Sequence, residues 1–161
     1  MKITDLLKRE SIELLGTPES KAQAIDQMVA LMAKGGNVCD LQRYKEGVLK
    51  REEEGTTGIG EGIAIPHAKT DAVSAPGLAA MLVPQGVEYD ALDGQPVHMI
   101  FLIAAPNTED NVHLEVLSRL SMLLMDDQFR LDLLDAKNVE EFLKGIDAAE
   151  RKKFPEEYGE E

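Results

Sequence analysis

The chain has 161 residues, of which 43% are hydrophobic, so it has the length of one domain with enough apolar residues for a sizeable core. Lys and Arg number 17 against 30 Asp and Glu, and the resulting net charge of −13 argues against binding to nucleic acid or to an anionic membrane surface. Such a surface favours a protein partner with a basic docking face.

The sequence also indicates a compartment. The single cysteine, Cys39, cannot form an internal disulfide, which fits a reducing environment. No stretch is long and apolar enough to span a bilayer, and residues 1–4 do not begin a signal-peptide pattern. We therefore expect a cytoplasmic protein.

The N-terminal third is predicted to begin with one or two helical turns over residues 4–9 and a short strand over residues 11–15. A longer helix follows Ser20, which forms a capping-box pattern with Gln23, and it ends at the glycine pair that begins with Gly35.

A second helix is predicted from the N-cap Asp40 to Gly55. Its apolar positions at helical spacing are predicted to be buried: Leu41, Tyr44 and Val48. Arg51 lies one turn beyond Val48 on the same face. Such a cation is either a side chain that snorkels at the edge of the core or a cation directed at the glycine-rich segment that follows.

Residues 58–69 are the most informative segment. Glycines alternate from Gly58 to Gly62, which allows positive φ and close approach of the backbone to a ligand. Residues 63–65 are predicted to form a brief buried strand, and Pro66 then fixes the angle at which His67 follows in a loop. His67 is suited to nucleophilic or acid–base chemistry, although a loop with a hydrogen-bonded surface histidine explains the same pattern.

The middle of the chain contains the strongest strand signals. Residues 71–77 are predicted to be irregular, residues 78–83 and 97–104 to form interior strands, and residues 87–89 a short strand. His98 is interpreted as a structural residue, because no other chemically active residue type lies around it in the sequence.

The C-terminal part is predicted to be helical. His113 lies in the first turn of a long helix, where free N–H groups and the helix dipole favour an anion; a buried histidine bonded to a carbonyl is the alternative. Further helices begin near Asp127 and after the N-cap Asn138. Residues 1–150 are predicted to form the domain, and residues 151–161 an acidic tail or the start of a linker, with regular structure lost from Lys152. Helices on either side of two interior strands predict an α/β fold, with helices covering both faces of a mixed sheet.

The motifs around Arg51, His67 and His113 resemble the enzyme IIA domain of the bacterial phosphoenolpyruvate-dependent sugar phosphotransferase system, fructose/mannitol type. The resemblance covers residues 3–146. It rests on Arg51, on Gly-Ile-Gly-Glu-Gly-Ile-Ala-Ile-Pro-His ending at His67, and on His-Leu-Glu-Val-Leu-Ser-Arg-Leu starting at His113. It implies a three-layer α/β/α sandwich with a mixed β-sheet.

The resemblance also implies a reaction. His67 is expected to accept a phosphoryl group from the phosphocarrier protein HPr, while His113 and Arg51 orient and stabilise that group. The phosphoryl-site loop is expected to comprise Gly58, Gly60, Glu61 and Pro66. The group would then pass to a cysteine of an enzyme IIB domain, on a separate protein or on the same polypeptide, and the membrane sugar permease would be served indirectly. Fructose or a related sugar is the expected cargo.

No cofactor or metal is expected, and the chain lacks a Walker-type ATP motif. Two alternatives remain open at this stage. One is a nitrogen-related regulatory enzyme IIA, which signals by phosphorylation-dependent binding of other proteins. The other is a metal-binding module built from His67, His113 and Cys39, although these residues lack the short paired spacing of a structural zinc site.

Overall fold

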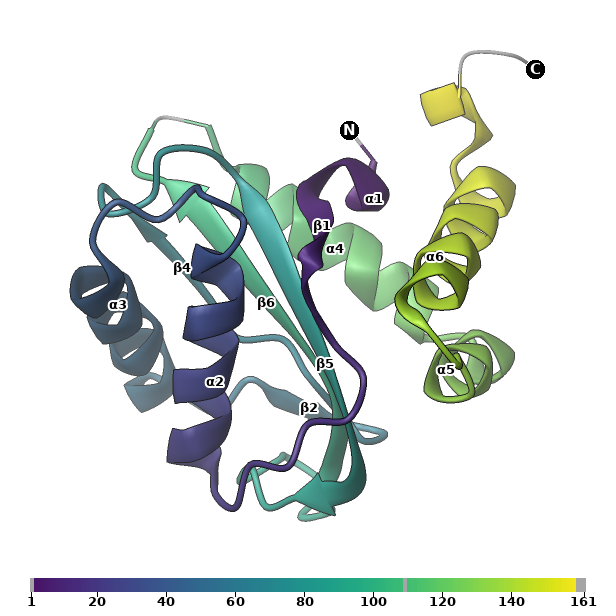
Figure 1. Cartoon of the computed structure of the whole chain (residues 1–161), viewed down its shortest axis with the longest axis horizontal. Helices are drawn as coiled ribbons and strands as arrows, with labels where there is room; N and C mark the ends of the chain where they lie inside the picture. The colour runs from purple at the N-terminus through teal and green to yellow at the C-terminus, as the bar shows by residue number, and fades with distance from the viewer. Residues whose placement is uncertain (1, 109, 159–161) are drawn as a thin grey trace.

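The computed structural model describes residues 2–108 and 110–158. Figure 1 shows a sheet with helices on either side of it. The strands are β1 (Leu7–Glu13), β2 (Gly58–Gly60), β3 (Ile63–Ala64), β4 (His67–Thr70), β5 (Gly77–Val87) and β6 (Val97–Pro106). The helices are α1 (Ile3–Leu6), α2 (Lys21–Ala33), α3 (Leu41–Glu53), α4 (Val112–Leu124), α5 (Asp127–Leu134), α6 (Val139–Lys153) and the 3-10 helix η1 (Pro155–Tyr158).

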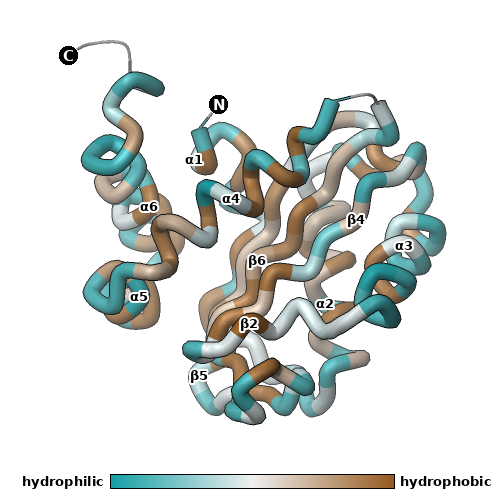
Figure 2. The backbone as a smooth tube through the Cα atoms, turned by 180° about the vertical axis from the view of Figure 1, so that it is seen from behind, coloured by the Kyte–Doolittle hydropathy of each residue, from teal (hydrophilic) through white to brown (hydrophobic). Residues whose placement is uncertain are grey.

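Strand β6 is the centre of a mixed sheet with the order β1-β5-β6-β3-β2. It runs antiparallel to β5 and parallel to β3, which pairs with its first half. Strand β4 pairs in parallel with the second half of β6, where His67 lies opposite Ile103. Two short strands thus share one edge of β6. In the hydropathy view of Figure 2, β6 is among the most hydrophobic strands, as expected for a strand covered on both faces.

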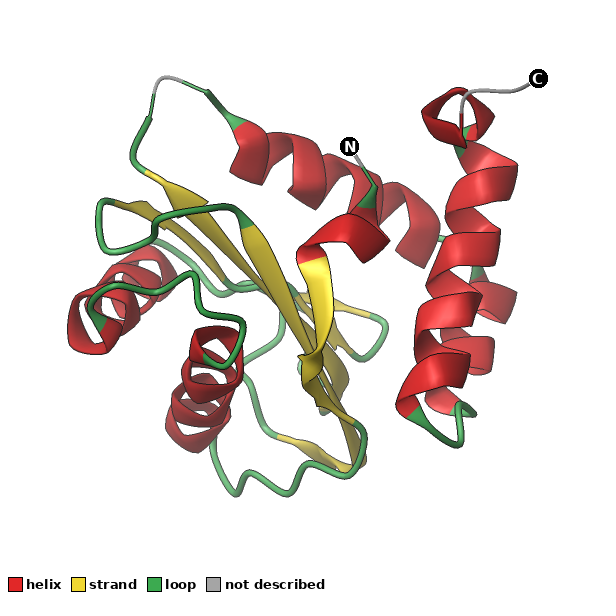
Figure 3. Cartoon of the chain, turned by 45° about the horizontal axis from the view of Figure 1, so that its top comes forward, coloured by secondary structure: helices red, strands yellow, loops and turns green. Residues whose placement is uncertain are grey.

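Two separate cores show that the sheet is covered on both faces. One core joins α2 and α3 to one face, and the other joins α1, α4, α5 and α6 to the opposite face. Figure 3 shows these two groups of helices on either side of the strands. The predicted three-layer α/β/α sandwich with a mixed sheet is therefore confirmed. No helix within the described residues is both long and apolar enough to cross a membrane.

The predicted helix starts are confirmed by their caps. The side chain of Ser20 accepts a hydrogen bond from the backbone N–H of Gln23, and Asp40 and Asn138 accept equivalent bonds at the starts of α3 and α6. One burial prediction is wrong, because the side chain of Leu41 is 47% exposed at the first position of α3.

The predicted boundaries at the N-terminus are also wrong. Helix α1 ends at Leu6, and β1 covers residues 7–13 rather than 11–15. The reason lies far along the chain, since the buried carboxylate of Glu150 on α6 accepts hydrogen bonds from the backbone N–H groups of Ile3 and Thr4. This contact holds the N-terminus of α1 against α6. The helix ends at Leu6, and Leu7 already pairs with β5.

Three further elements differ from the prediction. His67 begins strand β4 instead of lying in a loop, because residues 67–70 pair with β6. Residues 77–87 form a single strand, with an irregularity between Leu82 and Val87 in place of the predicted break. Helix α6 continues to Lys153 and is followed by η1, whose Tyr158 hydroxyl donates to the Asp147 side chain at 2.7 Å.

The predicted loss of structure from Lys152 is therefore wrong for the residues described, and residues 159–161 lie outside them. The domain boundary at residue 150 and a linker after it stay predictions.

A buried carboxylate fixes the C-terminal end of α3. Glu52, whose side chain is 6% exposed, forms an ion pair with Lys21 of α2 at 2.9 Å. The backbone N–H of Thr57 donates to it at 3.1 Å, and the Tyr89 hydroxyl donates to it at 3.3 Å. The Thr57 hydroxyl contacts the same carboxylate. Glu52 therefore ties α3 to α2 and to the segment that leads into β2.

We expect the substitution Glu52→Ala to lower the free energy of unfolding by roughly 3 kcal/mol, since removing one partner leaves several polar groups unsatisfied. Urea denaturation measures this loss. The matched control is Glu53→Ala, because Glu53 is the next residue on α3 and is exposed. That variant should stay within about 0.5 kcal/mol of the wild type. Equal stabilities of the two variants would contradict the role given to Glu52.

Candidate active site

A pocket opens at the edge of β4, between a helix from each outer layer. Its volume is about 390 Å³. Strand β4 pairs only with β6 among the described strands, so its other edge is free to face this pocket. Helix α3 lines the pocket from one layer and the first turn of α4 lines it from the other. The lining residues are Gly47, Lys50, Arg51, Glu54, His67, Ala68, Lys69, His113 and Leu114.

His67 is held by the backbone before it. Pro66 is buried, and its carbonyl accepts a hydrogen bond from the N–H of Ile103 at 3.0 Å, which sets the start of β4 against β6. The Nδ1 atom of His67 lies 2.9 Å from the carbonyl oxygen of Ile65. A carbonyl can only accept, so Nδ1 carries the proton and donates it. The Nε2 lone pair of the neutral ring is therefore available as a nucleophile.

His113 faces His67 across the pocket. The two ring centroids are 6.4 Å apart and the rings are tilted by 38°. The Nδ1 atom of His113 is buried and has no hydrogen-bond partner among the described residues. Because a buried N–H without a partner is rarer than a buried acceptor without one, we assign the proton of the neutral ring to Nε2. Burial lowers the pKa of His113. The charge of His67, when that ring is protonated, and the charge of Lys69 lower this pKa further. His113 is thus a neutral hydrogen-bond donor at the N-terminus of α4.

Arg51 is positioned by the close approach of α3 to β4. The buried Tyr44 hydroxyl donates to the carbonyl of Ile103 at 2.8 Å, which fixes α3 on the central strand. One turn further, a side chain on Gly47 would place a Cβ only 3.3 Å from the Cβ of Ala68, so the small residue allows this contact. Arg51 follows after another turn and lines the pocket, where its Nη1 donates to the carbonyl of Gly55 at 2.8 Å. Its remaining N–H groups can bind an anion.

Two cations of the pocket, Lys50 and Lys69, were not assigned a role from the sequence. Together with Arg51 they give three cationic side chains against one carboxylate, Glu54, in a chain whose net charge is −13. The pocket is therefore a local basic site suited to an anion. In a strand, side chains two residues apart point to the same face, so Lys69 lies on the same face as His67. The sequence indicates this only if residues 67–70 are predicted as a strand.

The glycine-rich segment does not line this pocket. Gly58 packs where a Cβ would lie 2.9 Å from the Cα of Ala91, and Gly60 has a φ of +101° that favours glycine. The backbone N–H of Glu61 donates to the Asp93 side chain at 3.2 Å, and the Glu61 carboxylate lies 3.6 Å from the guanidinium of Arg130. The structure thus brings His67, His113 and Arg51 together with Pro66 behind them, and it places Gly58, Gly60 and Glu61 against the segment of residues 89–93 and α5.

The family model described as "Phosphoenolpyruvate-dependent sugar phosphotransferase system, EIIA 2" matches residues 5–149. The chain belongs to this family. It is therefore a phosphotransfer component of the EIIA type, as the resemblance of its motifs predicted.

Relatives of two different lengths match this EIIA chain. It is 50% identical over 138 residues to the fructose-specific EIIABC component of Bacillus subtilis, covering 86% of this chain and 22% of that protein. It is 39% identical over 141 residues to the fructose-specific EIIA component of Haloferax volcanii, covering 86% of this chain and 92% of that protein. The chain thus spans about a fifth of the length of the first relative and nearly all of the second.

Two solved structures share the fold. The nitrogen regulatory protein IIA-Ntr from Neisseria meningitidis is 29% identical and superposes with a TM-score of 0.83, covering 89% of this chain and 98% of that one. The enzyme IIA for mannitol from Escherichia coli, determined in complex with phosphorylated enzyme IIB, is 28% identical, with a TM-score of 0.77 and coverage of 89% and 99%.

The remaining candidate residues lie outside the pocket. His98 is half-buried, and its Nδ1 atom lies 3.1 Å from the carbonyl of Val83, which fits the structural role predicted for it. Cys39 is exposed and does not line the pocket with His67 and His113. Within residues 2–108 and 110–158, no group of three or more His, Cys, Asp or Glu side chains could hold a metal ion. The structure gives no support to the metal-binding alternative.

Proposed function

We propose that this EIIA chain carries a phosphoryl group on Nε2 of His67, taken from the phosphohistidine of HPr and passed to a cysteine of an enzyme IIB domain during uptake of fructose or a related sugar. The observation that carries the proposal is the pocket itself. It contains a histidine whose Nε2 makes no hydrogen bond within the described part of the chain, a second histidine with its ring centroid 6.4 Å away, and an arginine, all in a basic environment.

The chemistry of the transfer is determined by the hydrogen bond of Nδ1. The Nε2 lone pair forms a bond to phosphorus as the bond from phosphorus to the donor nitrogen breaks, and that electron pair stays on the donor ring. The proton stays on Nδ1 of His67, because the N–H there donates a hydrogen bond to the carbonyl of Ile65 throughout the transfer. Charge develops on the equatorial phosphoryl oxygens, where Arg51 and the Nε2–H of His113 can bind them.

The relatives support an enzyme IIB domain as a partner more directly than they support HPr. They include an EIIABC component and a complex of enzyme IIA with phosphorylated enzyme IIB. Both favour an enzyme IIB domain as acceptor, either on the same polypeptide or separate. The family resemblance is the basis for three further parts of the proposal. These are HPr as the phosphoryl donor, an indirect role in sugar uptake through a membrane permease, and a cytoplasmic location. The assignment of fructose as the sugar depends on the names of the two fructose-specific relatives.

A nitrogen-related regulatory role is the second candidate, because the structure of IIA-Ntr shares this fold with a TM-score of 0.83. The two candidates share the phosphohistidine and differ in the fate of its phosphoryl group. A sugar-uptake carrier must lose its phosphoryl group to an enzyme IIB cysteine, whereas a regulatory protein need only bind its targets.

The test is a labelling experiment in two steps. Incubation with phosphoenolpyruvate, enzyme I and HPr should add one acid-labile, base-stable phosphoryl group per chain, detected by intact-mass spectrometry. Addition of a fructose-type enzyme IIB should then discharge it, while an IIB variant that lacks the acceptor cysteine should not. A stable phosphoprotein that no enzyme IIB discharges would favour the regulatory candidate, and absence of labelling would contradict both.

A further inference from the structure

A lysine without a role in the family resemblance lies next to the candidate nucleophile. Lys69 is two residues after His67 in β4, and side chains two residues apart in a strand point to the same face. At a rise of about 3.3 Å per residue, their Cα atoms are about 6.6 Å apart along the strand. Ala68 between them points the other way and is buried. The ammonium of Lys69 can therefore reach a group carried on Nε2 of His67.

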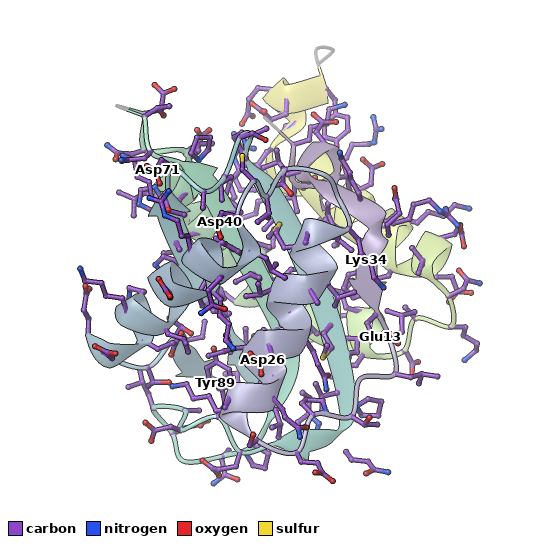
Figure 4. The ribbon with its side chains drawn as sticks, turned by 60° about the vertical axis from the view of Figure 1, so that its left-hand side comes forward. Glu13, Asp26, Lys34, Asp40, Asp71 and Tyr89 are labelled. Atoms are coloured by element: carbon purple, nitrogen blue, oxygen red, sulfur yellow. The ribbon has the colours of Figure 1, made fainter. Side chains whose placement is uncertain are left out.

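This ammonium is also free to bind. Lys69 makes no hydrogen bond or ion pair with any residue that the structure describes. The nearest acid along the chain is Asp71, whose carboxylate is engaged by Arg43 of α3 at 2.5 Å. The backbone N–H of Arg43 donates to Asp40, the N-cap of that helix, and Figure 4 labels both carboxylates. The charge of Lys69 reaches across the pocket, since it contributes to lowering the pKa of His113.

We propose that Lys69 is a further catalytic residue, whose ammonium binds an equatorial oxygen of the phosphoryl group during its transfer to His67. The proposal rests on the proposed function of His67. A phosphoryl group in transit has three equatorial oxygens, and the pocket then offers one donor for each, from Arg51, His113 and Lys69. The lysine carries a point charge on a flexible stem, so it can follow the phosphorus as it moves between the two nitrogens. No proton is transferred in this step, because the ammonium binds the oxygen and keeps its protons.

The experiment measures single-turnover transfer from phosphorylated HPr by rapid quench, over a range of HPr concentrations. This range separates the rate constant at saturation from the apparent affinity. Lys69→Met removes the charge and Lys69→Arg retains it. The control is Lys144→Met, which makes the same change in net charge on the exposed face of α6, in the layer opposite α3. All variants are first shown to unfold cooperatively.

We expect Lys69→Met to lower the saturating rate constant at least tenfold with little change in apparent affinity. Lys69→Arg should recover it to within about threefold of the wild type, and Lys144→Met should leave it unchanged. A loss that appears only in the apparent affinity, or equally in Lys144→Met, would show that Lys69 acts through net charge and would overturn the proposal. Wild-type transfer by Lys69→Met overturns the role of Lys69 alone, whereas a wild-type chain that accepts no phosphoryl group on His67 overturns the proposed function as well.

Discussion

The substitution His67→Ala is expected to abolish phosphorylation by HPr, with a rate at least about a thousandfold below that of the wild type. The pocket then keeps a single imidazole, His113, whose unprotonated Nδ1 is buried and so cannot meet the donor phosphohistidine. His67→Gln should be equally inactive, since an amide nitrogen cannot form the bond to phosphorus. Transfer of radiolabel from phosphoenolpyruvate through enzyme I and HPr measures both variants.

His98→Gln is the control for His67, because His98 is half-buried and bonded to a backbone carbonyl outside the pocket. That variant should be labelled fully. The position of the phosphoryl group on the ring provides a second check, since Nδ1 is engaged by Ile65 and the phosphoryl group should therefore be on Nε2. Labelling of His67→Ala, or a phosphoryl group on Nδ1 of the wild type, would refute the assignment.

The second large effect is expected for His113. His113→Ala should slow transfer by about a hundredfold, or about 2.7 kcal/mol of activation free energy, as found when one preorganised donor is removed from an active site. His113→Gln should lose about tenfold or less, because its amide nitrogen lies near the position of the imidazole Nε2–H. His113→Asn is shorter, cannot place a donor there, and should behave like the alanine variant.

Stability distinguishes this role from a structural one. The buried Nδ1 of His113 has no partner among the described residues, so its replacement breaks no hydrogen bond there. Urea midpoints of the three variants should therefore stay close to that of the wild type. If His113→Gln is as slow as His113→Ala while both are folded, His113 does not act as a donor, and wild-type transfer by the alanine variant would remove it from the mechanism altogether.

Local patterns in the sequence are sufficient to predict which segments form the helical layers and which form the central strands. Ser20, Asp40 and Asn138 each combine a capping side chain with apolar residues at helical spacing, and both signals lie within one helix. The strands β5 and β6 are buried on both faces over most of their length. Each therefore contains a continuous apolar run that is visible in the sequence. The position of His113 in the first turn of its helix followed from the spacing of the apolar residues after it.

Features that depend on distant partners were not predictable in this way. The end of α1 is set by Glu150, which is 147 residues away from Ile3. Residues 67–70 have a single buried residue, Ala68, and become a strand only because β6 offers its edge. Without that strand the direction of Lys69 could not be inferred. The glycine pattern was visible in the sequence, but its packing against Ala91 required the tertiary structure.

One residue of the central strand connects both halves of the candidate site. The N–H of Ile103 bonds the carbonyl before His67, and the carbonyl of Ile103 accepts from Tyr44 on the helix that carries Arg51. The spacing between nucleophile and cation is therefore set inside the sheet and does not depend on the acidic surface. The two relatives differ in what surrounds the matching segment, which makes up 22% of one protein and 92% of the other. A site whose spacing is set by one internal strand requires no contact from outside that segment.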